Sequence, residues 1–280
     1  MSSEYTAIRA AVSGEAAPNT AGRFGFGANW VRYLRHISEA KIIAATADLA
    51  ALLTLPSLKD LTLLDIGSGS GIHSLAAVRL GATVTSFDYD YDSVACTRSL
   101  RDQFAGEAAA RWTVVGQGSV LDDAFVASLG HFDIVYSWGV LHHTGAMRRA
   151  IAAAVSRVSP TGLLVIALYN DQGLISDYWT AVKRAYNAGA AGRLAMTGAH
   201  LPYLGARIAV RALTGKGSLE RGMSMWHDYI DWLGGFPFEV ASPCDVEQWL
   251  AEAGFTLQAV RTVGRRQGCN EYVFARAHAS

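Results

Sequence analysis

The sequence predicts an α/β fold: a doubly wound, mostly parallel seven-stranded sheet with an antiparallel last strand and a mainly helical cap insertion. Two observations support this prediction. Short apolar runs alternate with helical patterns between residues 61 and 170, as expected for a parallel sheet covered by helices on both faces. The alternation stops over residues 171–243, which hold no clear strand, and it resumes from residue 244 onward.

Each apolar run in the first part is followed by a helical pattern that Gly or Pro ends. The predicted strands are 61–66, 82–88, 112–115, 132–137 and 162–169, and the predicted helices are 30–55, 72–80, 92–104, 122–129 and 146–158. Pro56 closes the first of these helices and Pro160 the last. After the insertion, a helix over 245–253 precedes strands 255–263 and 271–276, which turn glycines join into a hairpin.

The chain is therefore divided into four parts. Residues 1–55 form an N-terminal helical lid, and residues 56–170 form the ligand-binding core. Residues 171–243 form a cap for the substrate, and residues 244–280 complete the core. We expect the insertion to cover the carboxyl end of the sheet, where open α/β sheets bind ligands.

Composition restricts the class of protein. The 280 residues are 51% apolar and 17% charged, with a formal net charge of zero, so no nucleic-acid partner is expected. Cys96, Cys244 and Cys269 lie far apart, which argues against a structural zinc site and a disulfide framework. Residues 1–10 lack the apolar segment of a signal peptide, and no run of 18 apolar residues occurs. A cytoplasmic location is expected.

The most informative motif is the glycine turn Gly67–Gly71, which follows an apolar run that includes Asp65. Such a turn lets a nucleotide-like ligand lie on the backbone, and Asp88, at the end of the next predicted strand, can bind a ribose. The motif therefore predicts an adenosine-containing cofactor. The dinucleotide fingerprint has glycine at its sixth position, where this chain has Ile72, so a dehydrogenase is disfavoured.

Four segments together resemble class I S-adenosylmethionine-dependent methyltransferases, and in particular the branch that includes ubiquinone-biosynthesis O-methyltransferases. They are Leu63–Gly71, Phe87–Asp90, Phe132–His143 and Gly162–Ile166. The terminal hairpin fits the reversed last strand of this Rossmann-like fold. The resemblance implies S-adenosylmethionine as the cofactor and methyl transfer as the activity.

The resemblance also implies how the cofactor is held. The turn glycines would leave room for its methionine part, Asp88 would accept from the ribose diol, and Tyr89 would pack against adenine. The family often has an acidic residue after the third strand, whereas this chain has Ser119. For Asp65, orientation of the loop is an equal alternative to cofactor contact. The full predicted set is Asp65, Gly67, Ser68, Gly69, Gly71, Asp88, Tyr89, Ser119, Val120 and Ser137.

Three histidines are candidate catalytic bases. A hydroxyl acceptor benefits from a base whose pKa is near the working pH, and histidine supplies one. His142 and His143 follow the fourth predicted strand, where the transferable methyl group is expected, and His227 lies in the insertion beside Asp228. The alternatives are a loop hydrogen bond for one of the paired histidines and a helix cap for His227. No ligand spacing supports a metal site.

Aromatic and amide side chains are predicted to line the acceptor pocket. The candidates are Trp30, Trp138, Tyr169, Asn170 and Trp226, with a core-anchor role as the alternative for Trp30. Two further carboxylates, Glu239 and Glu271, are candidate bases, although ordinary surface positions are the favoured explanation for both.

Residues 183–221 hold seven Lys or Arg and one acidic residue, with leucines and isoleucine among them. This pattern predicts a cationic amphipathic helix, which suits peripheral membrane contact or a lipid-like or phosphorylated acceptor. A solvated face over a packed helix is the favoured interpretation of the same pattern.

The predicted function is methyl transfer to a small-molecule acceptor, at a hydroxyl oxygen, by in-line displacement with a histidine base. A carbon or nitrogen acceptor is the first alternative, on a natural-product, lipid-like or glycan precursor. An RNA methyltransferase is more remote, because the sequence shows neither a basic RNA-binding domain nor an Asn-Pro-Pro-Tyr-like motif. A non-catalytic partner subunit is disfavoured by the intact motifs. The oligomeric state is left open.

Overall fold

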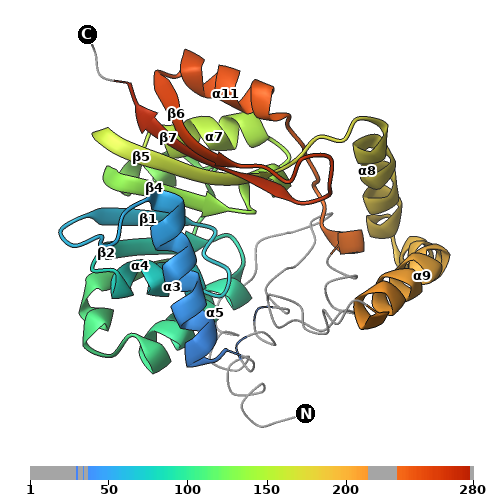
Figure 1. The fold of residues 1–280 in the computed structure, drawn as a ribbon, viewed down its shortest axis with the longest axis horizontal. Coiled ribbons are helices and arrows are strands. Elements are labelled where there is room, and N and C mark those ends of the chain that lie inside the picture. The colour runs from blue at the N-terminus through green and yellow to red at the C-terminus, as the bar shows by residue number, and fades with distance from the viewer. Residues whose placement is uncertain (1–29, 31–33, 35–36, 214–231, 278–280) are drawn as a thin grey trace.

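The computed structural model describes residues 30–277 apart from 31–33, 35–36 and 214–231. Its centre is a seven-stranded sheet of order β3-β2-β1-β4-β5-β7-β6 (Figure 1). The first five strands are parallel, and β7 runs antiparallel to both β5 and β6. The strands are β1 Thr62–Ile66, β2 Thr83–Asp88, β3 Trp112–Gln117, β4 Phe132–Trp138, β5 Val158–Tyr169, β6 Phe255–Arg261 and β7 Cys269–Arg276. The predicted fold class is confirmed.

Helices cover both faces of this sheet. Figure 1 shows α3, α4 and α5 on one face and α7 and α11 on the other. The described helices are α3 Glu39–Leu53, α4 Ile72–Arg79, α5 Tyr91–Phe104, α6 Asp123–Ser128, α7 Met147–Val155, α8 Leu174–Asn187, α9 Ala190–Leu213 and α11 Pro243–Glu252, with the short 3-10 helices η1 Gly106–Arg111 and η2 Leu141–His143.

The alternation of side chains along β1 builds two separate apolar layers. Leu63 packs into the cluster formed with α3, α4 and α5, whereas Leu64 and Ile66 point the other way, into the cluster with α7 and α11. Each fully buried aliphatic side chain contributes about 1.5–3 kcal/mol relative to exposure. Because both faces are buried, β1 is held firmly, and the glycine turn that follows it is held in a fixed position.

The helix predicted over 30–55 is interrupted, because Trp30 and Leu34 are helical whereas Ile37 and Ser38 are not. Helix α3 begins at Glu39, because the Ser38 side chain accepts a hydrogen bond from the backbone N–H of Lys41 and caps the helix. Its end agrees with the prediction, with Thr54 in the left-handed region at φ 54°. Ser38, although it lies inside an apolar periodic run, therefore marks the start of α3.

The predicted stop at Pro160 is wrong. Helix α7 ends at Val155, and β5 begins at Val158, so Pro160 lies inside the strand. The ladder with β4 is irregular at this point, because Phe132 pairs with Val158 and Ile134 pairs with Leu163. Proline is tolerated in a strand at such an irregularity, where no ladder hydrogen bond is lost.

The described part of the insertion is mainly helical. Figure 1 shows α8 and α9 beside the sheet, past the end of β5. The hydroxyl of Tyr178 on α8 lies 2.7 Å from Nε2 of His200 on α9 and ties the two helices together. Among the described residues, neither of these helices nor any other is both long and apolar enough to cross a membrane.

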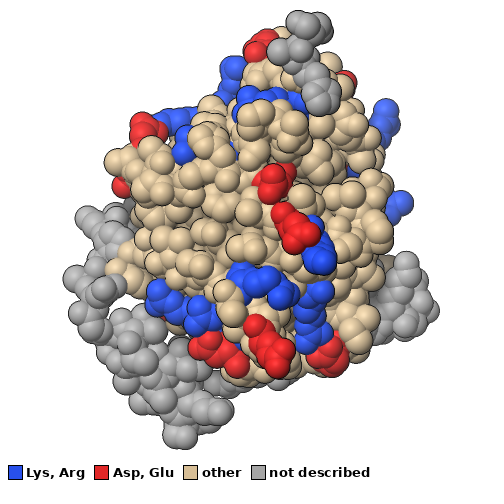
Figure 2. Space-filling view, turned by 90° about the vertical axis from the view of Figure 1, so that its left-hand side faces the viewer, with Lys and Arg blue, Asp and Glu red and all other residues tan. Residues whose placement is uncertain are grey.

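Charges of both signs share the surface on the opposite side. Figure 2 shows this face, where Lys and Arg side chains lie close to Asp and Glu side chains. Such mixing agrees with the formal net charge of zero.

Candidate active site

The glycine turn after β1 has the geometry that its sequence predicts. Gly67, Gly69 and Gly71 have φ values of 77°, 56° and 83°, in the region that favours glycine. The backbone N–H groups of Gly67 and Ser68 both donate to the carbonyl oxygen of Phe87, at 3.0 and 3.1 Å. The turn is thereby anchored to the end of β2, next to Asp88.

Three side chains pack closely against this turn. A Cβ atom at Gly67 would lie 2.5 Å from Val140, and one at Gly69 would lie 3.0 Å from the indole of Trp30. Thr97 on α5 closes the third side, at Gly71. Trp30 thus lies over the glycine turn, where the predicted lid would meet a cofactor.

We predict that Gly67→Ala destabilises the protein by about 2–5 kcal/mol, because it adds left-handed strain of about 1–2 kcal/mol to overpacking of about 1–3 kcal/mol against Val140. Gly130→Ala is the matched control. Its φ is also positive, at 83°, but no atom lies within 4 Å of the added Cβ. The strain alone is expected there. Denaturant unfolding measures the loss of unfolding free energy in each variant. Equal losses in Gly67→Ala and Gly130→Ala would contradict the predicted overpacking against Val140.

Asp88 presents a carboxylate beside the turn. Its Oδ2 accepts from the N–H of Gly69 at 2.8 Å, and its Oδ1 accepts from the N–H of Asp90 at 2.9 Å. Burial raises the pKa of this carboxyl to about 6, and the two backbone donors act against that rise. Each oxygen keeps a lone pair for a further donor, which is what a ribose diol requires.

Asp65 is held from the opposite side of the turn. The hydroxyl of Ser74 on α4 donates to its Oδ2 at 2.6 Å. Burial raises the pKa of Asp65 to about 7, and the nearby charge of Asp88 adds to the rise. This contact ties β1 to α4.

The other predicted cofactor residues lie along the same edge. Ser137, fully buried on β4, donates to the carbonyl oxygen of Ile66 at 3.0 Å. The Ser119 hydroxyl accepts from the N–H of Leu121 at 3.2 Å, and Val120 is buried. The carbonyl oxygen of Tyr89 accepts from the Gln117 amide at 2.9 Å. The residues present suit an adenosine ligand, because carboxylate, hydroxyl and glycine backbone converge where β1, β2 and β4 end.

The two neighbouring histidines make different hydrogen bonds. Nδ1 of His143 lies 2.6 Å from the carbonyl oxygen of Pro237. A carbonyl only accepts, so Nδ1 holds the proton and the lone pair of the neutral ring is on Nε2. Burial lowers the pKa of His143 to about 4, and the charge of Lys183 lowers it further against the pull of the Pro237 carbonyl. The ring is therefore neutral at pH 7.

His142 has the opposite tautomer. Its Nδ1 accepts from the backbone N–H of Tyr169 at 3.3 Å, so the proton of the neutral ring is on Nε2. The side chain is fully buried, and burial lowers its pKa well below the usual range, with His143 and Lys183 adding to the effect. His142 joins η2 to the end of β5.

An aromatic cluster lies against the histidines, made by Tyr169, Trp179, Trp232 and Phe238. The Tyr169 ring is 4.0 Å from His142 and 5.4 Å from His143 between ring centroids. On its other side it meets Trp232 and Phe238. Tyr169, predicted from the sequence for the acceptor pocket, therefore lies between the histidines and the cap.

The remaining predicted residues are more scattered. The indole N–H of Trp138 donates to Glu271 at 2.8 Å, and its ring lies 6.2 Å from His73. Glu239, the other candidate base, accepts from the N–H of Met147 at the start of α7. Trp226 and His227 lie outside the described residues.

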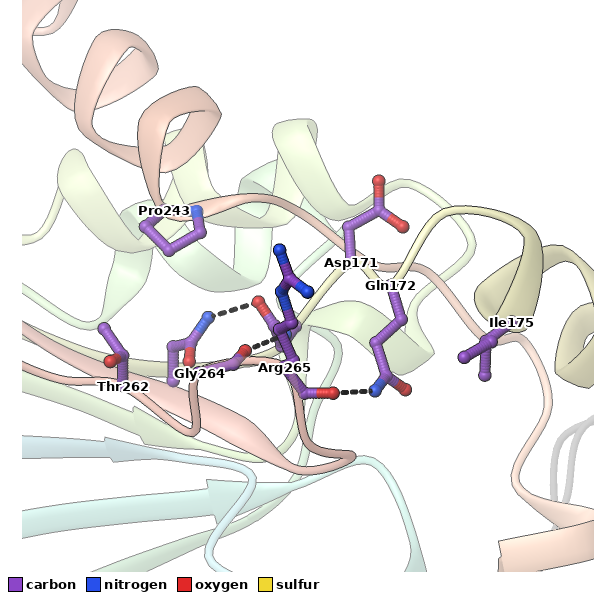
Figure 3. A pocket seen from close by; sticks show the side chains of 9 residues that line it. Asp171, Gln172, Ile175, Pro243, Thr262, Gly264 and Arg265 are labelled. Atoms are coloured by element: carbon purple, nitrogen blue, oxygen red, sulfur yellow. Dashed lines mark hydrogen bonds between the residues drawn. The ribbon is translucent and has the colours of Figure 1, made fainter.

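Asn170 lines a cavity of about 430 Å³ between the end of β5, the start of α8 and the terminal hairpin (Figure 3). Its Nδ2 donates to the carbonyl oxygen of Gly264, and its Oδ1 accepts from Nδ2 of Asn270, both at 2.9 Å. Figure 3 shows Gln172 bound in the same way to the backbone of Arg265. The amide of Asn170 thus fastens the hairpin to the end of β5.

Sequence reasoning missed Lys183, Pro237 and Trp232. Lys183 opens the basic stretch that was predicted as a cationic helix face, yet its side chain is fully buried. Its spacing was a usable signal, because it lies one helical turn from both Trp179 and Tyr186 on an apolar face. Within the described ranges, no group of three His, Cys, Asp or Glu side chains is placed to hold a metal ion.

The sheet order, the glycine turn and the acidic end of β2 together define the class I methyltransferase fold, and the comparisons agree. The methyltransferase-domain family matches residues 33–260, so the chain belongs to that family. The predicted class, S-adenosylmethionine-dependent methyltransferases, is confirmed.

Curated relatives are ubiquinone biosynthesis O-methyltransferases. The one from Methylobacterium nodulans is 34% identical over 113 residues, which are 40% of this chain and 43% of that protein. The one from Sinorhizobium fredii is 30% identical over 113 residues, which are again 40% of this chain and 43% of that protein. The chain thus matches less than half the length of these relatives.

Two solved structures share the fold. Magnesium protoporphyrin IX methyltransferase from Synechocystis PCC 6803, with bound S-adenosylhomocysteine, has a TM-score of 0.50 at 16% identity and covers 98% of this chain and 95% of its own. An O-methyltransferase family protein from Burkholderia thailandensis has a TM-score of 0.51 at 15% identity. The match covers 86% of this chain and 59% of that protein. At these identities the likeness shows the fold.

Proposed function

We propose that this chain transfers a methyl group from S-adenosylmethionine to a hydroxyl oxygen of a small molecule, with His143 as general base. One observation carries the proposal. The Pro237 carbonyl holds the proton of His143 on Nδ1, which puts the lone pair on Nε2, the atom that would accept the hydroxyl proton. The names of the curated O-methyltransferases support the oxygen acceptor.

The cofactor would be held by the glycine turn and by the residues around it. Asp88 would accept from the ribose diol, Ser137 would lie beside the amino-acid part, and Tyr89 would pack on the adenine. When bound, S-adenosylmethionine supplies an electrophilic methyl group on a sulfonium, whose carbon–sulfur bond breaks as the carbon–oxygen bond forms. Asp65 would hold the turn in place through Ser74.

His143 would take the hydroxyl proton on Nε2 as the acceptor oxygen reacts. The lowered pKa of His143, about 4, keeps the ring neutral and able to accept a proton at pH 7, but it makes the ring a weaker base than the near-neutral value expected from the sequence. The rings of Tyr169, Trp232 and Phe238 would keep water from the reacting atoms. We assign His142 a positioning role, because its Nδ1 already accepts from Tyr169.

Other assignments from the sequence stay proposals. His227, Trp226 and Trp30 remain candidates for closing the acceptor site from the cap and the lid, with Trp138 and Asn170 as its further walls. A carbon or nitrogen acceptor is the alternative reaction on the same site.

Peripheral membrane contact through 183–221 also stays a proposal, as do a lipid-like or phosphorylated acceptor and a cytoplasmic location. Exposed apolar side chains on α9 support the membrane contact: Leu194 is 78% exposed and Val210 is 58% exposed. The burial of Lys183 removes one positive charge from that face. Co-sedimentation with anionic vesicles at low salt checks this proposal, and absence of binding would remove it.

The function is tested by incubating the protein with methyl-labelled S-adenosylmethionine and a panel of phenols, aliphatic alcohols and amines. We expect label in the hydroxyl compounds. Label found only in amines would replace the oxygen acceptor by a nitrogen acceptor. Calorimetry with S-adenosylhomocysteine and NAD completes the test, and tight binding of NAD alone would overturn the cofactor.

We predict that the affinity for S-adenosylhomocysteine falls as the pH drops below about 6. The ribose diol donates to the ionised Asp88, whose pKa of about 6 is raised above its usual value, so each unit of pH below 6 costs up to about tenfold in affinity. Calorimetry between pH 5 and 7.5 measures the trend. Asp88→Asn should still bind with reduced affinity, and that affinity should no longer depend on pH. If the affinity of the wild type did not change between pH 5 and 7.5, the assignment would be contradicted.

A further inference from the structure

Lys183 carries its charge in the interior of the protein. It lies in the middle of α8, and its side chain is 0% exposed. Burying an ammonium group is costly, and an apolar side chain of similar volume is often as stable or more stable in such a place. A lysine at a position where the apolar face of α8 would accept methionine or leucine therefore points to a use for the charge.

The ammonium group is fixed by the cap. It donates to the carbonyl oxygen of Trp232. It also lies 4.3 Å from the centroid of the Trp232 ring and 4.8 Å from that of Phe238. Aromatic faces attract a cation, and this attraction is stronger away from water. Lys183 thus has one defined position behind the aromatic cluster.

One short segment joins this cation to the candidate base. The ring of Phe238 lies beneath Lys183, and the carbonyl of Pro237, the preceding residue, holds Nδ1 of His143. Tyr169 makes the second link, because its ring contacts His143 on one side and Trp232 on the other. The positive charge therefore lies behind the wall that faces the reacting atoms, in a medium that screens it poorly.

We propose that Lys183 selects the acceptor by charge: its buried ammonium group favours a hydroxyl that gives up its proton to His143 readily, a phenol whose oxygen develops phenolate charge, over an aliphatic alcohol. The proposal rests on the proposed function and names its substrate class. Lys183 acts through its field and through the rings, without contact with the acceptor, so it is a specificity-determining residue.

The protonation of the histidines agrees with such a field. The charge of Lys183 lowers the pKa of both His142 and His143, after the larger effect of burial. A field that disfavours a proton on these rings favours negative charge on an oxygen bound beside them. Among the described residues, the other titratable groups near this wall include Tyr178 and Tyr186 on α8, His200 beside Trp179, and Glu239, which accepts from the first residue of α7.

The test uses 4-nitrophenol, whose absorbance reports its ionisation, with the protein saturated by S-adenosylhomocysteine. We expect the bound probe to ionise at least one pH unit below the free probe, a tenfold preference for the phenolate. Lys183→Met should remove most of that preference, and Lys183→Arg, which keeps the charge, should retain it. Lys59→Met is the matched control, because Lys59 is exposed in the loop before β1.

Three results would overturn the proposal: a bound probe that ionises like the free one, a site that does not bind the probe, or an unchanged preference in Lys183→Met. Circular dichroism checks folding of the variants. If Lys183→Met does not fold, the wild-type titration still decides, together with Lys183→Gln. The proposed oxygen acceptor is tested by a separate experiment. Methyl label found only in amines would reject the oxygen acceptor, while the 4-nitrophenol titration would still report on Lys183.

Discussion

Replacing His143 by alanine is expected to lower kcat by about 10²–10⁴, the usual contribution of a positioned general base. The reason is the tautomer that Pro237 imposes, which puts the only basic atom of the neutral ring on Nε2. Without it, the hydroxyl proton must leave to water. Single-turnover transfer from labelled S-adenosylmethionine to a phenol of the acceptor panel measures the loss, and calorimetry with S-adenosylhomocysteine should show unchanged cofactor binding.

His142→Ala is the matched control, one residue away and of the same type. Since His142 is fully buried and positions Tyr169, its loss should lower the free energy of unfolding by about 2–4 kcal/mol and should lower the kcat of the folded enzyme much less than His143→Ala does. The base assignment would fall if His143→Ala retained full activity, or if His142→Ala alone lost turnover while remaining folded.

Replacing Asp88 by alanine is expected to weaken S-adenosylhomocysteine binding by about 100-fold or more. Each hydrogen bond to a charged group is worth about 1.5–3 kcal/mol, and the ribose diol would donate two. The change also leaves the N–H groups of Gly69 and Asp90 without their carboxylate partner, so the glycine turn loses an anchor. Calorimetry at pH 7.5 measures the affinity.

Asp88→Asn separates these two effects. The amide keeps the size and one acceptor oxygen, so the turn stays largely in place while the charge is lost. We expect an affinity between those of the wild type and Asp88→Ala. If both variants bound the cofactor like the wild type, the ribose-binding role of Asp88 would be rejected.

The fold was largely predictable because its signals are local. Apolar runs and helical periodicity place the strands and helices, and the glycine turn with Asp88 identifies the edge where a cofactor would bind. The exceptions have equally local causes. The side chain of Ser38 starts α3 inside an apolar run, and Pro160 enters β5 at an irregularity of the ladder.

The candidate catalytic site was predictable only in part, because its chemistry depends on distant contacts. The sequence placed His142 and His143 at the end of β4 but could not assign their tautomers. The partner that decides, Pro237, is 94 residues further along the chain from His143. Lys183 was assigned to an exposed basic face, because a run of positive charges conceals the apolar neighbours that bury it.

The segment Pro237–Glu239 shows why the two halves of this enzyme are not interchangeable modules. Within three residues, a carbonyl holds His143, a ring lies beneath Lys183, and Glu239 binds the backbone of both His142 and Met147. A cap exchanged with that of a relative would remove the contacts that set the tautomer of His143, the proposed base. New acceptor specificities are therefore expected from substitutions elsewhere in the cap, with Pro237–Glu239 left intact.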